Sequence, residues 1–596
     1  MTSAREAFDL YRAGRTAEAA ALCERLVADA PSVEAWHLLG VTRLELGLAQ
    51  AALAALDAGL ALDPVRPGLL SARTLALTAL QRDDEAVVAA RAALAADPDN
   101  PPVFNALAVS LQRLGGFSEA LAAIDHAVAV APREPAYRTH RAALLTLLNR
   151  PADAARDLEV VLELNPSHPR LAGDLMWARR QTCDWREDAA LDMLVKADLK
   201  LGRPGVAPFA ALALFDLPAL HRRCAALSAT PSVPPPVWPV RPTSDRIRVA
   251  YLSSDLHEHA TARLLAGVLE AHDRSRFEIF AVSYGPETGG VMQGRLKVAC
   301  EHWIEARRLS DAEIALKCRE HGVDIAVDLK GYTQDGRPGI LAHRAAPVQV
   351  SWLGYPGTLG AHADVVLADA VTIPPGAEAH WSEAVVRLPH YQPNDVLTPA
   401  IPAPSRAEAG LPQDARVFCC FNNPAKITPE VFATWMAILR AAPGSVLWLY
   451  AGAPGADDNL RAHAREAGVA PERLVFADPT QHDRHLARHA LADLVLDTWP
   501  YGAHTTASDA LRMGVPVLTL PGESFASRVG ASLATAIGMS ELIATSKADY
   551  VAKALSLAAD KALKPRIAAA VRRSALFDPV AFARSLEAAY AGMVRR

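Results

Sequence analysis

The chain has 596 residues and a formal net charge of −5, with 51% hydrophobic and 21% charged residues. This length suggests three or four domains, and the composition excludes a disordered chain because it supplies enough apolar side chains for large cores. The small negative charge gives no reason to expect a nucleic acid as partner.

The N-terminal segment and the cysteines indicate an intracellular protein. The first residues, MTSAREAFDLYRAGR, are polar and lack the apolar stretch of a signal peptide. No window of eighteen residues has the apolar character that a membrane span requires. The seven cysteines show no zinc-ligand spacing, which fits reduced thiols. We therefore expect a soluble, cytoplasmic protein with no membrane partner.

Two columns of residues recur with one period in the first third of the chain. The prolines of this period are separated by 33, 34, 34 and 34 residues: Pro31, Pro64, Pro98, Pro132 and Pro166. The alanines with the same spacing are Ala19, Ala52, Ala86, Ala120 and Ala154. Small alanines let two helices approach closely, and proline stops the second helix before the next unit begins. The period predicts about five stacked helix–turn–helix repeats over residues 1–168.

These repeats resemble the tetratricopeptide repeat, whose consensus has the same length, small-residue positions and terminal proline. Trp36, Leu39 and Gly40 match the first-helix positions of that consensus. The resemblance implies a superhelix with a concave groove that binds extended peptide, so we expect this arm to hold a protein or peptide acceptor. A generic helical bundle is the alternative, and whether the arm also forms a homo-oligomer stays open.

The composition and periodicity of the sequence change twice after the repeats. Residues 169–245 read as a helical and proline-rich linker, because the period is lost and TPSVPPPVWPVRPTSD cannot form helix or central strand. From IRVAYLSSD (247–255) onward, short β-rich runs alternate with helical segments. This alternation predicts parallel sheets covered on both faces, in two α/β domains over 246–400 and 401–596. Ligands of such folds bind at the carboxyl ends of the strands.

The strongest chemical signal is LDTWPYGAHTTASDALRMGVPVLTLPG (496–522). A helix is predicted to begin around His504, Thr505 and Thr506, where unpaired amides, the helix dipole and two hydroxyls would suit a pyrophosphate. Asp509, one turn further, could accept ribose hydroxyls. The alternative is that the two threonines only cap the helix.

Two other segments that follow predicted strands carry lysine, histidine and arginine side chains. Lys426 precedes a predicted helix and could neutralise charge on a departing phosphate, although most lysines are solvated surface residues. His482, His485 and His489 share one helical face, but the metalloprotease glutamate is absent and no cysteine accompanies them. His485 with Arg488 instead suits stacking on a base and pairing with phosphate.

The first α/β domain offers loops of weaker signal. His259 follows a strand and could contact a reacting sugar or transfer a proton. DLKGYT (328–333) and GYPGTLGA (354–361) are loops whose glycines permit close backbone approach to a ligand. The chain has no G-x-G-x-x-G after a strand and no Walker lysine motif, which argues against NAD enzymes and P-loop ATPases.

Together these segments resemble the O-linked N-acetylglucosamine transferase family. The matching pieces are VAYLSSDLHEHAT, DLKGYT, WLGYPGTLGA, FNNPAKITP, SVLWLYAG, LADLVLDTWPYGAHTT and PVLTLPGESFASRVGASL. The resemblance implies a GT-B glycosyltransferase of two Rossmann-like lobes, with a UDP-sugar in the cleft and no metal or other cofactor. It implies inverting transfer of N-acetylglucosamine from UDP-GlcNAc to serine and threonine hydroxyls of proteins. UDP-glucose-dependent transfer, including transfer to asparagine, and a catalytically weak repeat scaffold are the alternatives.

The resemblance also implies roles for single residues. The UDP-sugar-binding set is Asn423, Lys426, His482, His485, Arg488, His504, Thr505, Thr506 and Asp509. Within it Lys426 stabilises the leaving group and His485 stacks on the uridine, while His259 is the active-site histidine of the first lobe. The acceptor or sugar side is assigned to Asp328, Tyr332, Tyr355 and Thr358. The general base stays open between His259, Asp328 and the phosphate of the donor.

Animal members of the family differ at four positions near these residues. They carry glutamine at the position of Asn423, lysine at that of His482, proline at that of Ala260 and asparagine at that of Asp328. These departures affect the expected contacts with the donor rather than the class of enzyme.

Overall fold

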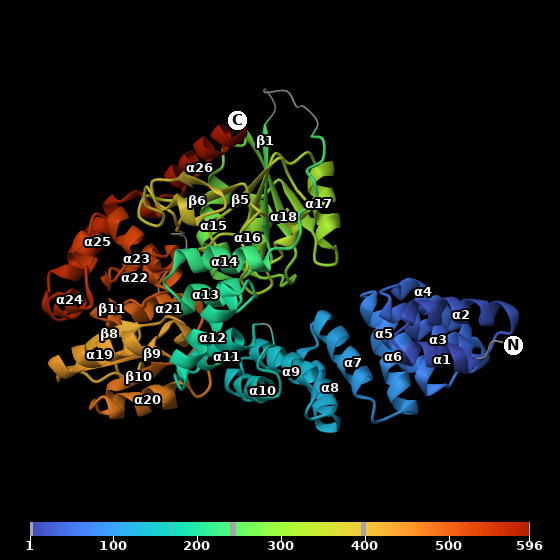
Figure 1. Cartoon of the computed structure of the whole chain (residues 1–596). Coiled ribbons are helices and arrows are strands. Elements are labelled where there is room, and N and C mark those ends of the chain that lie inside the picture. The colour runs from blue at the N-terminus through green and yellow to red at the C-terminus, as the bar shows by residue number, and fades with distance from the viewer. Residues whose placement is uncertain (1–3, 169, 239–245, 395–400, 595–596) are drawn as a thin grey trace. The chain divides into compact units, whose positions relative to one another are not determined.

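The computed structural model describes residues 4–168, 170–238, 246–394 and 401–594 (Figure 1). The chain divides into two compact units, Met1–Leu171 and Ala172–Arg596, which are taken one at a time below.

The first unit is built from pairs of helices. Within its described residues the helices are α1 (Ala4–Arg12), α2 (Thr16–Asp29), α3 (Val33–Glu45), α4 (Ala49–Leu62), α5 (Pro67–Ala79), α6 (Asp83–Ala96), α7 (Pro101–Arg113), α8 (Phe117–Val130), α9 (Pro135–Leu147) and α10 (Pro151–Leu164). Each periodic proline lies two residues beyond the end of a second helix, and all five periodic alanines are buried. A Cβ added at Gly40 would lie 2.4 Å from a side-chain atom of Leu56, which explains the small residue where α3 meets α4. The predicted repeats are confirmed.

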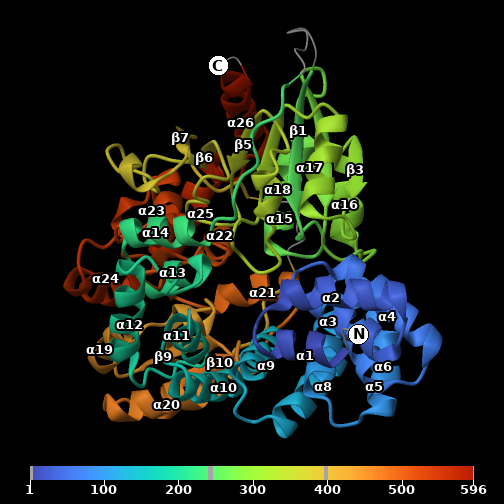
Figure 2. The same cartoon turned by 45° about the vertical axis from the view of Figure 1, so that its right-hand side comes forward.

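The second unit contains two parallel sheets. The first sheet has the order β3-β2-β1-β4-β5-β6-β7 and the second has the order β10-β9-β8-β11-β12. The elements of the first lobe are β1 (Ile247–Ser253), α15 (Ala260–Ala271), β2 (Phe277–Ser283), α16 (Val291–Ala299), β3 (His302–Glu305), α17 (Asp311–Glu320), β4 (Ile325–Asp328), α18 (Gly339–Ala342), β5 (Val348–Ser351), β6 (Val365–Ala368) and β7 (Ala384–Arg387). Helices lie on both faces of this sheet, as the buried strands require (Figures 1 and 2).

The second lobe follows the same plan with fewer strands. Its elements are β8 (Arg416–Cys420), α19 (Pro429–Ala441), β9 (Ser445–Tyr450), α20 (Ala456–Glu466), β10 (Leu474–Ala477), α21 (His482–Arg488), β11 (Leu494–Leu496), α22 (Thr505–Arg512), β12 (Val517–Leu518), α23 (Phe525–Ala536), α24 (Lys547–Ala559) and α25 (Leu563–Arg573). In each sheet the chain leaves the central strand in one direction and later returns on its other side. This reversal opens a crevice at the carboxyl ends of β1 and β4 in one lobe, and of β8 and β11 in the other.

The last helix, α26 (Pro579–Val594), returns to the first lobe. The carboxylate of Glu587 accepts hydrogen bonds from His272 Nδ1 at 3.1 Å and from the amide of Asp273 at 2.7 Å. The ring of Phe582 stacks on Trp352 with 5.8 Å between centroids. The C-terminal helix therefore fastens the second lobe to the first.

Four helices before β1 also belong to the second unit's packing: α11 (Leu171–Gln181), α12 (Asp188–Lys200), α13 (Pro208–Leu214) and α14 (Pro218–Ser228). Near the end of α11, the carbonyl of Thr182 accepts from Asn459 Nδ2 at 2.9 Å. Leu212 of α13 lies in one apolar cluster with Ala250 of the first lobe and Tyr501 of the second. This segment therefore contacts both lobes.

All seven cysteines are buried and none forms a disulfide. Within the described residues, no helix combines the length and the apolar character needed to cross a membrane.

Candidate active site

The crevice of the second lobe brings Lys426 to the start of α22. Lys426 ends a short 3₁₀ turn, Pro424–Lys426, whose first amides are capped by Asn423 Oδ1, which accepts from Ala425 at 2.9 Å. The Lys426 ammonium donates to the carbonyl of Gly502 at 2.9 Å and lies 3.9 Å from the ring centroid of Tyr501. These contacts join the ends of β8 and β11, as the sequence argument required.

The ammonium of Lys426 is held in a poorly solvated place. Burial lowers its pKa to about 8, although the nearby charge of Asp497 acts in the opposite direction. Asp497 is fully buried, and burial raises the pKa of its carboxyl to about 6. A cation of weakened hydration is well suited to bind an incoming diphosphate, because less water must be displaced.

The start of α22 presents amides rather than hydroxyls. His504 is the N-cap residue and its Nε2 donates to the carbonyl of Ala526 at 3.1 Å. Burial lowers the pKa of His504 to about 3, with a further contribution from Lys426, so the ring is neutral. The hydroxyl of Thr506 donates to Asn422 Oδ1 at 2.6 Å and is therefore already used within the lobe. The amides of Thr505 and Thr506 open α22, and the N-terminus of a helix at such a place suits an anion.

His485, Arg488 and Phe421 form a flat cluster beside this site. Arg488 Nη2 donates to His485 Nδ1 at 2.7 Å, and the Arg488 guanidinium lies 4.4 Å from the ring centroid of Phe421. Burial, assisted by neighbouring cations, lowers the pKa of His485 to about 2. Its ring is therefore neutral and fixed in orientation, as a stacking surface for a base requires. His482 lies 6.5 Å away, centroid to centroid.

Asp509 lies one turn into α22. Burial raises the pKa of its carboxyl to about 7, and the charges of Arg512 and Arg263 oppose this rise. The predicted donor residues of the second lobe therefore lie on segments that follow the parallel strands β8, β10 and β11, with Lys426 in contact with the loop that leads into α22.

The crevice of the first lobe holds a buried ion pair that sequence reasoning did not single out. Lys330 Nζ donates to Asp255 Oδ2 at 2.7 Å, and the lysine is only 5% exposed. His259 Nδ1 lies 3.3 Å from the same carboxylate oxygen and accepts from the amide of Thr261 at 3.2 Å, which caps α15. Burial lowers the pKa of His259 below its ordinary value. Both residues of the pair lie in quoted motifs, but only the fold shows that they meet.

Most of the residues predicted for the acceptor or sugar side form contacts that stabilise the loops of the first lobe. Asp328 accepts from the amides of Lys330 at 3.0 Å and Gly331 at 2.9 Å, and burial raises its pKa to about 6. Tyr332 donates weakly to the carbonyl of Leu359 at 3.3 Å. Tyr355 is packed in the apolar core of the first lobe. Thr358 is buried and its hydroxyl donates to Glu383 at 2.7 Å.

The turn after β5 is strained. Leu353 has φ of 74°, a conformation that side chains other than glycine rarely adopt, and its carbonyl accepts from Tyr391 Oη at 2.6 Å. A Cβ added at Gly354 would lie 1.9 Å from the carbonyl of Leu329. The loops after β4 and β5 are therefore in close contact at the carboxyl ends of these strands. In the sequence, only the glycine at position 354 indicates this contact.

Arg263 is a further residue that the sequence analysis missed. It lies in the first turn of α15, one turn after His259, in the first lobe. Its positive charge acts on two groups of the second lobe: it adds a small part to the lowered pKa of His485, after burial, His489, Arg488 and His482, and it opposes the rise in the pKa of Asp509 that burial causes. Arg263 therefore brings positive charge from the first lobe to the donor side.

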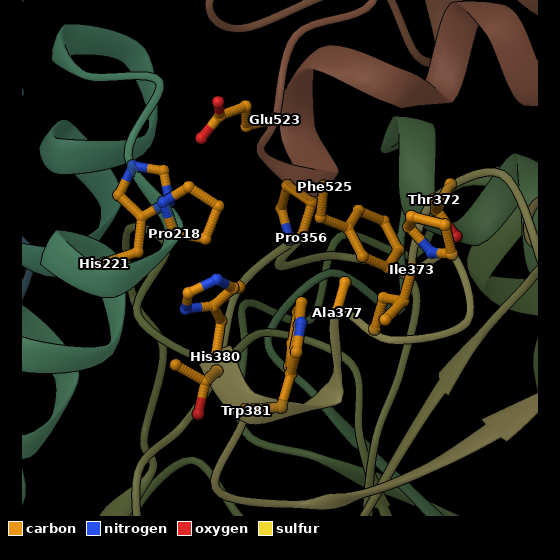
Figure 3. Close-up of a pocket in the computed structure, with 13 residues that line it drawn as sticks. Pro218, His221, Pro356, Thr372, Ile373, Ala377, His380, Trp381, Glu523 and Phe525 are labelled. Carbon is orange, nitrogen blue, oxygen red and sulfur yellow. The ribbon is translucent and has the colours of Figure 1, made fainter.

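Two cavities lie near these crevices without containing the predicted donor residues. The smaller, about 30 Å³, is lined by Thr358, by Trp381 and by Phe525 at the start of α23, among others, and is sized for a water molecule (Figure 3). The larger, about 880 Å³, is lined by the starts of α19 and α24 and by Trp499, Asp216 and Gly522. Within the described residues, no group of three histidine, cysteine or acidic side chains is arranged to hold a metal ion.

Two parallel α/β lobes with facing crevices, preceded in the sequence by helical repeats, define a tetratricopeptide-repeat protein with a GT-B catalytic fold. The sequence model of glycosyl transferase family 41 matches residues 238–392 and 392–586. Because this match covers more than half of the chain, the protein belongs to that family.

Several relatives carry related names. The probable UDP-N-acetylglucosamine–peptide N-acetylglucosaminyltransferase SEC of Arabidopsis thaliana is 35% identical over 359 residues, covering 58% of this chain and 37% of its own length. The corresponding transferase of Caenorhabditis elegans is 27% identical, covering 57% of this chain and 40% of its own length. The chain thus spans about two fifths of these curated relatives.

A solved structure resembles the chain over most of its length. It is a lysine-to-methionine mutant of the O-GlcNAc transferase of Thermobaculum terrenum. Its TM-score is 0.67 at 29% identity, covering 89% of this chain and 98% of that chain.

If the predicted ligand UDP binds at this site, the shifted pKa values predict how its affinity varies with pH. Lys426 loses its charge as pH rises through about 8, so affinity should fall above that value. Asp509 gains a proton as pH falls through about 7, so affinity should also fall below that value. Calorimetric titration of UDP between pH 6 and 10 would measure a maximum between the two limits. Asp509→Asn should abolish the acid limb alone, and a flat profile would contradict the assignment.

Arg263→Gln should weaken UDP binding about fivefold, because one positive charge acting on an anion through largely solvated surroundings contributes roughly 1 kcal/mol. Calorimetric titration would measure the change, and its size should shrink with added salt. Arg276→Gln, at an exposed position before β2, is the matched control and should leave the affinity unchanged. Equal effects of the two variants would argue against a donor-side role for Arg263.

Proposed function

We propose that this protein is an inverting glycosyltransferase that moves N-acetylglucosamine from UDP-GlcNAc to serine or threonine hydroxyls of proteins. The observation that carries the proposal is the contact of Lys426 with the carbonyl of Gly502, two residues before His504, the N-cap residue of α22. A cation and a helix N-terminus then converge where a leaving diphosphate would gather negative charge. Membership of glycosyl transferase family 41 and the names of its relatives support the same chemistry.

In the proposed reaction the acceptor oxygen forms a bond to the anomeric carbon while the bond from that carbon to the UDP oxygen breaks. The hydroxyl proton passes to a base, and the electron pair of the broken bond leaves with UDP. Lys426 and the first-turn amides of α22 stabilise the new charge, so the reaction should proceed in the presence of a chelator. His485 and Arg488 orient the base of the nucleotide, and Asp509 accepts from the ribose.

The identity of the general base stays open between three groups. His259 accepts the Thr261 amide at Nδ1, which leaves the proton of the neutral ring on Nε2 and suits a hydrogen-bond donor. The other tautomer, with Nδ1 donating to Asp255 at 3.3 Å, would free Nε2 to act as a base. Asp328 already accepts two loop amides. The phosphate of the donor, acting through water, is the third candidate.

We assign the acceptor polypeptide to the repeats. Their first two units enclose a cavity of about 380 Å³ between α1 and α3, lined by Phe8, Tyr11 and His37 among others. Such a mixture of apolar, aromatic and polar side chains suits a polypeptide segment. The acceptor proteins themselves are not implied by these residues.

A donor screen tests the function directly. UDP release from UDP-GlcNAc and from UDP-glucose, each with and without protein acceptors, should be fastest with UDP-GlcNAc plus acceptor. Mass spectrometry of the product should locate the sugar on serine or threonine. Faster reaction with UDP-glucose, or modification of asparagine, would favour a related transferase, and no release from either donor would favour a scaffold.

Lys426→Met should lower kcat by at least about 100-fold, because removal of one preorganised group that stabilises a leaving charge typically costs this much. Steady-state UDP release measures the loss, and circular dichroism should show the helices intact. Lys561→Met, the same change at an exposed lysine of the same unit, is the control and should retain full turnover. Near-normal turnover of Lys426→Met would refute the role of Lys426.

A further inference from the structure

The helical segment before the first lobe contacts the loop that we assign to the diphosphate. Resting on the proposed function, we propose that Asp216, in the turn between α13 and α14, is a positioning residue for the diphosphate-binding end of α22. Asp216 lies outside residues 238–586, the span matched by the family model. It would act through α23 and not by touching the donor.

Asp216 caps α23 from more than 300 positions away in the chain. Its Oδ1 accepts from the amide of Ser524 at 2.8 Å and its Oδ2 from the amide of Glu523 at 2.9 Å. Ser524 is the N-cap residue of α23, yet its own hydroxyl is buried and makes no hydrogen bond among the described residues. The Asp216 carboxylate thus binds the two amides just before the first helical residue, a place where the positive end of the helix favours a negative charge.

The loop before α23 is shaped to admit this carboxylate. A Cβ added at Gly522 would lie 1.9 Å from Asp216 Oδ2. An alanine at this position would therefore displace the Asp216 carboxylate. The Gly522 amide is held separately by Ser527 Oγ at 3.0 Å. Position 522 therefore has to be small only because Asp216 occupies the space beside it.

The first turn of α23 is hydrogen-bonded to the loop and the helix start that we assign to the donor. The carbonyl of Ala526 accepts from the amide of Gly502 at 2.9 Å and from His504 Nε2 at 3.1 Å. The carbonyl of the same Gly502 accepts from Lys426 at 2.9 Å. A shift of the α23 N-terminus would thus move both the start of α22 and the acceptor that orients the catalytic lysine.

The same helical segment also contacts the loop after β11, which carries Tyr501 and Gly502. Phe209 of α13 meets the ring of Tyr501 edge-on, with 6.1 Å between centroids, and Tyr501 is the ring beneath Lys426. The turn that carries Asp216 is itself fixed, because buried His221 donates to the carbonyls of Phe215 at 2.8 Å and Ala211 at 3.1 Å. Two side chains of one helical segment therefore contact two neighbouring loops: Asp216 binds the loop before α23, and Phe209 packs on the loop after β11 that carries Gly502.

Asp216→Asn tests the proposal, because an amide can accept only one of the two backbone N–H groups. We expect UDP Kd and the donor KM to rise about tenfold, with melting temperature nearly unchanged. Asp198→Asn is the matched control: this acid pairs with Arg203 at the end of α12 and should leave UDP Kd as in the wild type. A lower melting temperature with unchanged UDP Kd would mean that Asp216 only stabilises the fold.

A double-mutant cycle separates positioning from general damage. Because Asp216 acts in part through the carbonyl that orients Lys426, the effects of Asp216→Asn and Lys426→Met on the free energy of UDP binding should be less than additive. Additive effects would overturn the proposal. Should Asp216→Asn fail to fold, Gly522→Ala displaces the carboxylate instead, and it should raise UDP Kd similarly; an unchanged Kd would also overturn the proposal.

UDP binding by the wild-type protein distinguishes a failure of the positioning role of Asp216 from a failure of the proposed function. If the wild type binds UDP and the Asp216 and Gly522 variants bind equally well, only the positioning role fails. If the wild type does not bind UDP, the proposed function fails and the positioning role fails with it.

Discussion

The site depends on one constraint, the hydrogen bond of the Lys426 ammonium to the carbonyl of Gly502. A lysine from the end of β8 can reach this carbonyl only because β8 and β11 are neighbours in the sheet, although the ends of the two strands are 76 positions apart in the chain. The reversal of strand order leaves a crevice above this pair of strands, and parallel strands direct their carboxyl ends into it. The sheet topology therefore determines where a cation and a helix N-terminus can meet.

Burial then sets the electrostatics of the crevice. Lys426, Asp497 and Asp509 all have pKa values shifted toward their neutral forms, chiefly because each has lost solvation. Keeping such groups close together costs folding free energy, which the large apolar cores of the two lobes offset. The arrangement makes sense for an anionic ligand that restores the charged form of the lysine on binding.

The segment α11–α14 changes how the catalytic unit is understood. It contacts both lobes: Asp216 binds the amides before α23, and Phe209 packs on Tyr501, the ring beneath Lys426. Helix α26 joins the lobes from the other end of the chain through Glu587 and Phe582. The relation between the two crevices is thus set by elements outside the sheets, and Arg263 adds charge from the first lobe to the donor side of the second.

The sequence by itself determined the periodic repeats, the alternation of strands and helices, and the motif around His504, because each depends on neighbours along the chain. It also located Lys426 at a strand end, although its local pattern could not distinguish it from a surface lysine. Only the tertiary structure decided that Thr506 gives its hydroxyl to Asn422, that Lys330 pairs with Asp255, and that Asp216 caps α23. Such contacts join residues tens to hundreds of positions apart, so no local period or spacing encodes them; they follow from which strands and helices the fold places side by side.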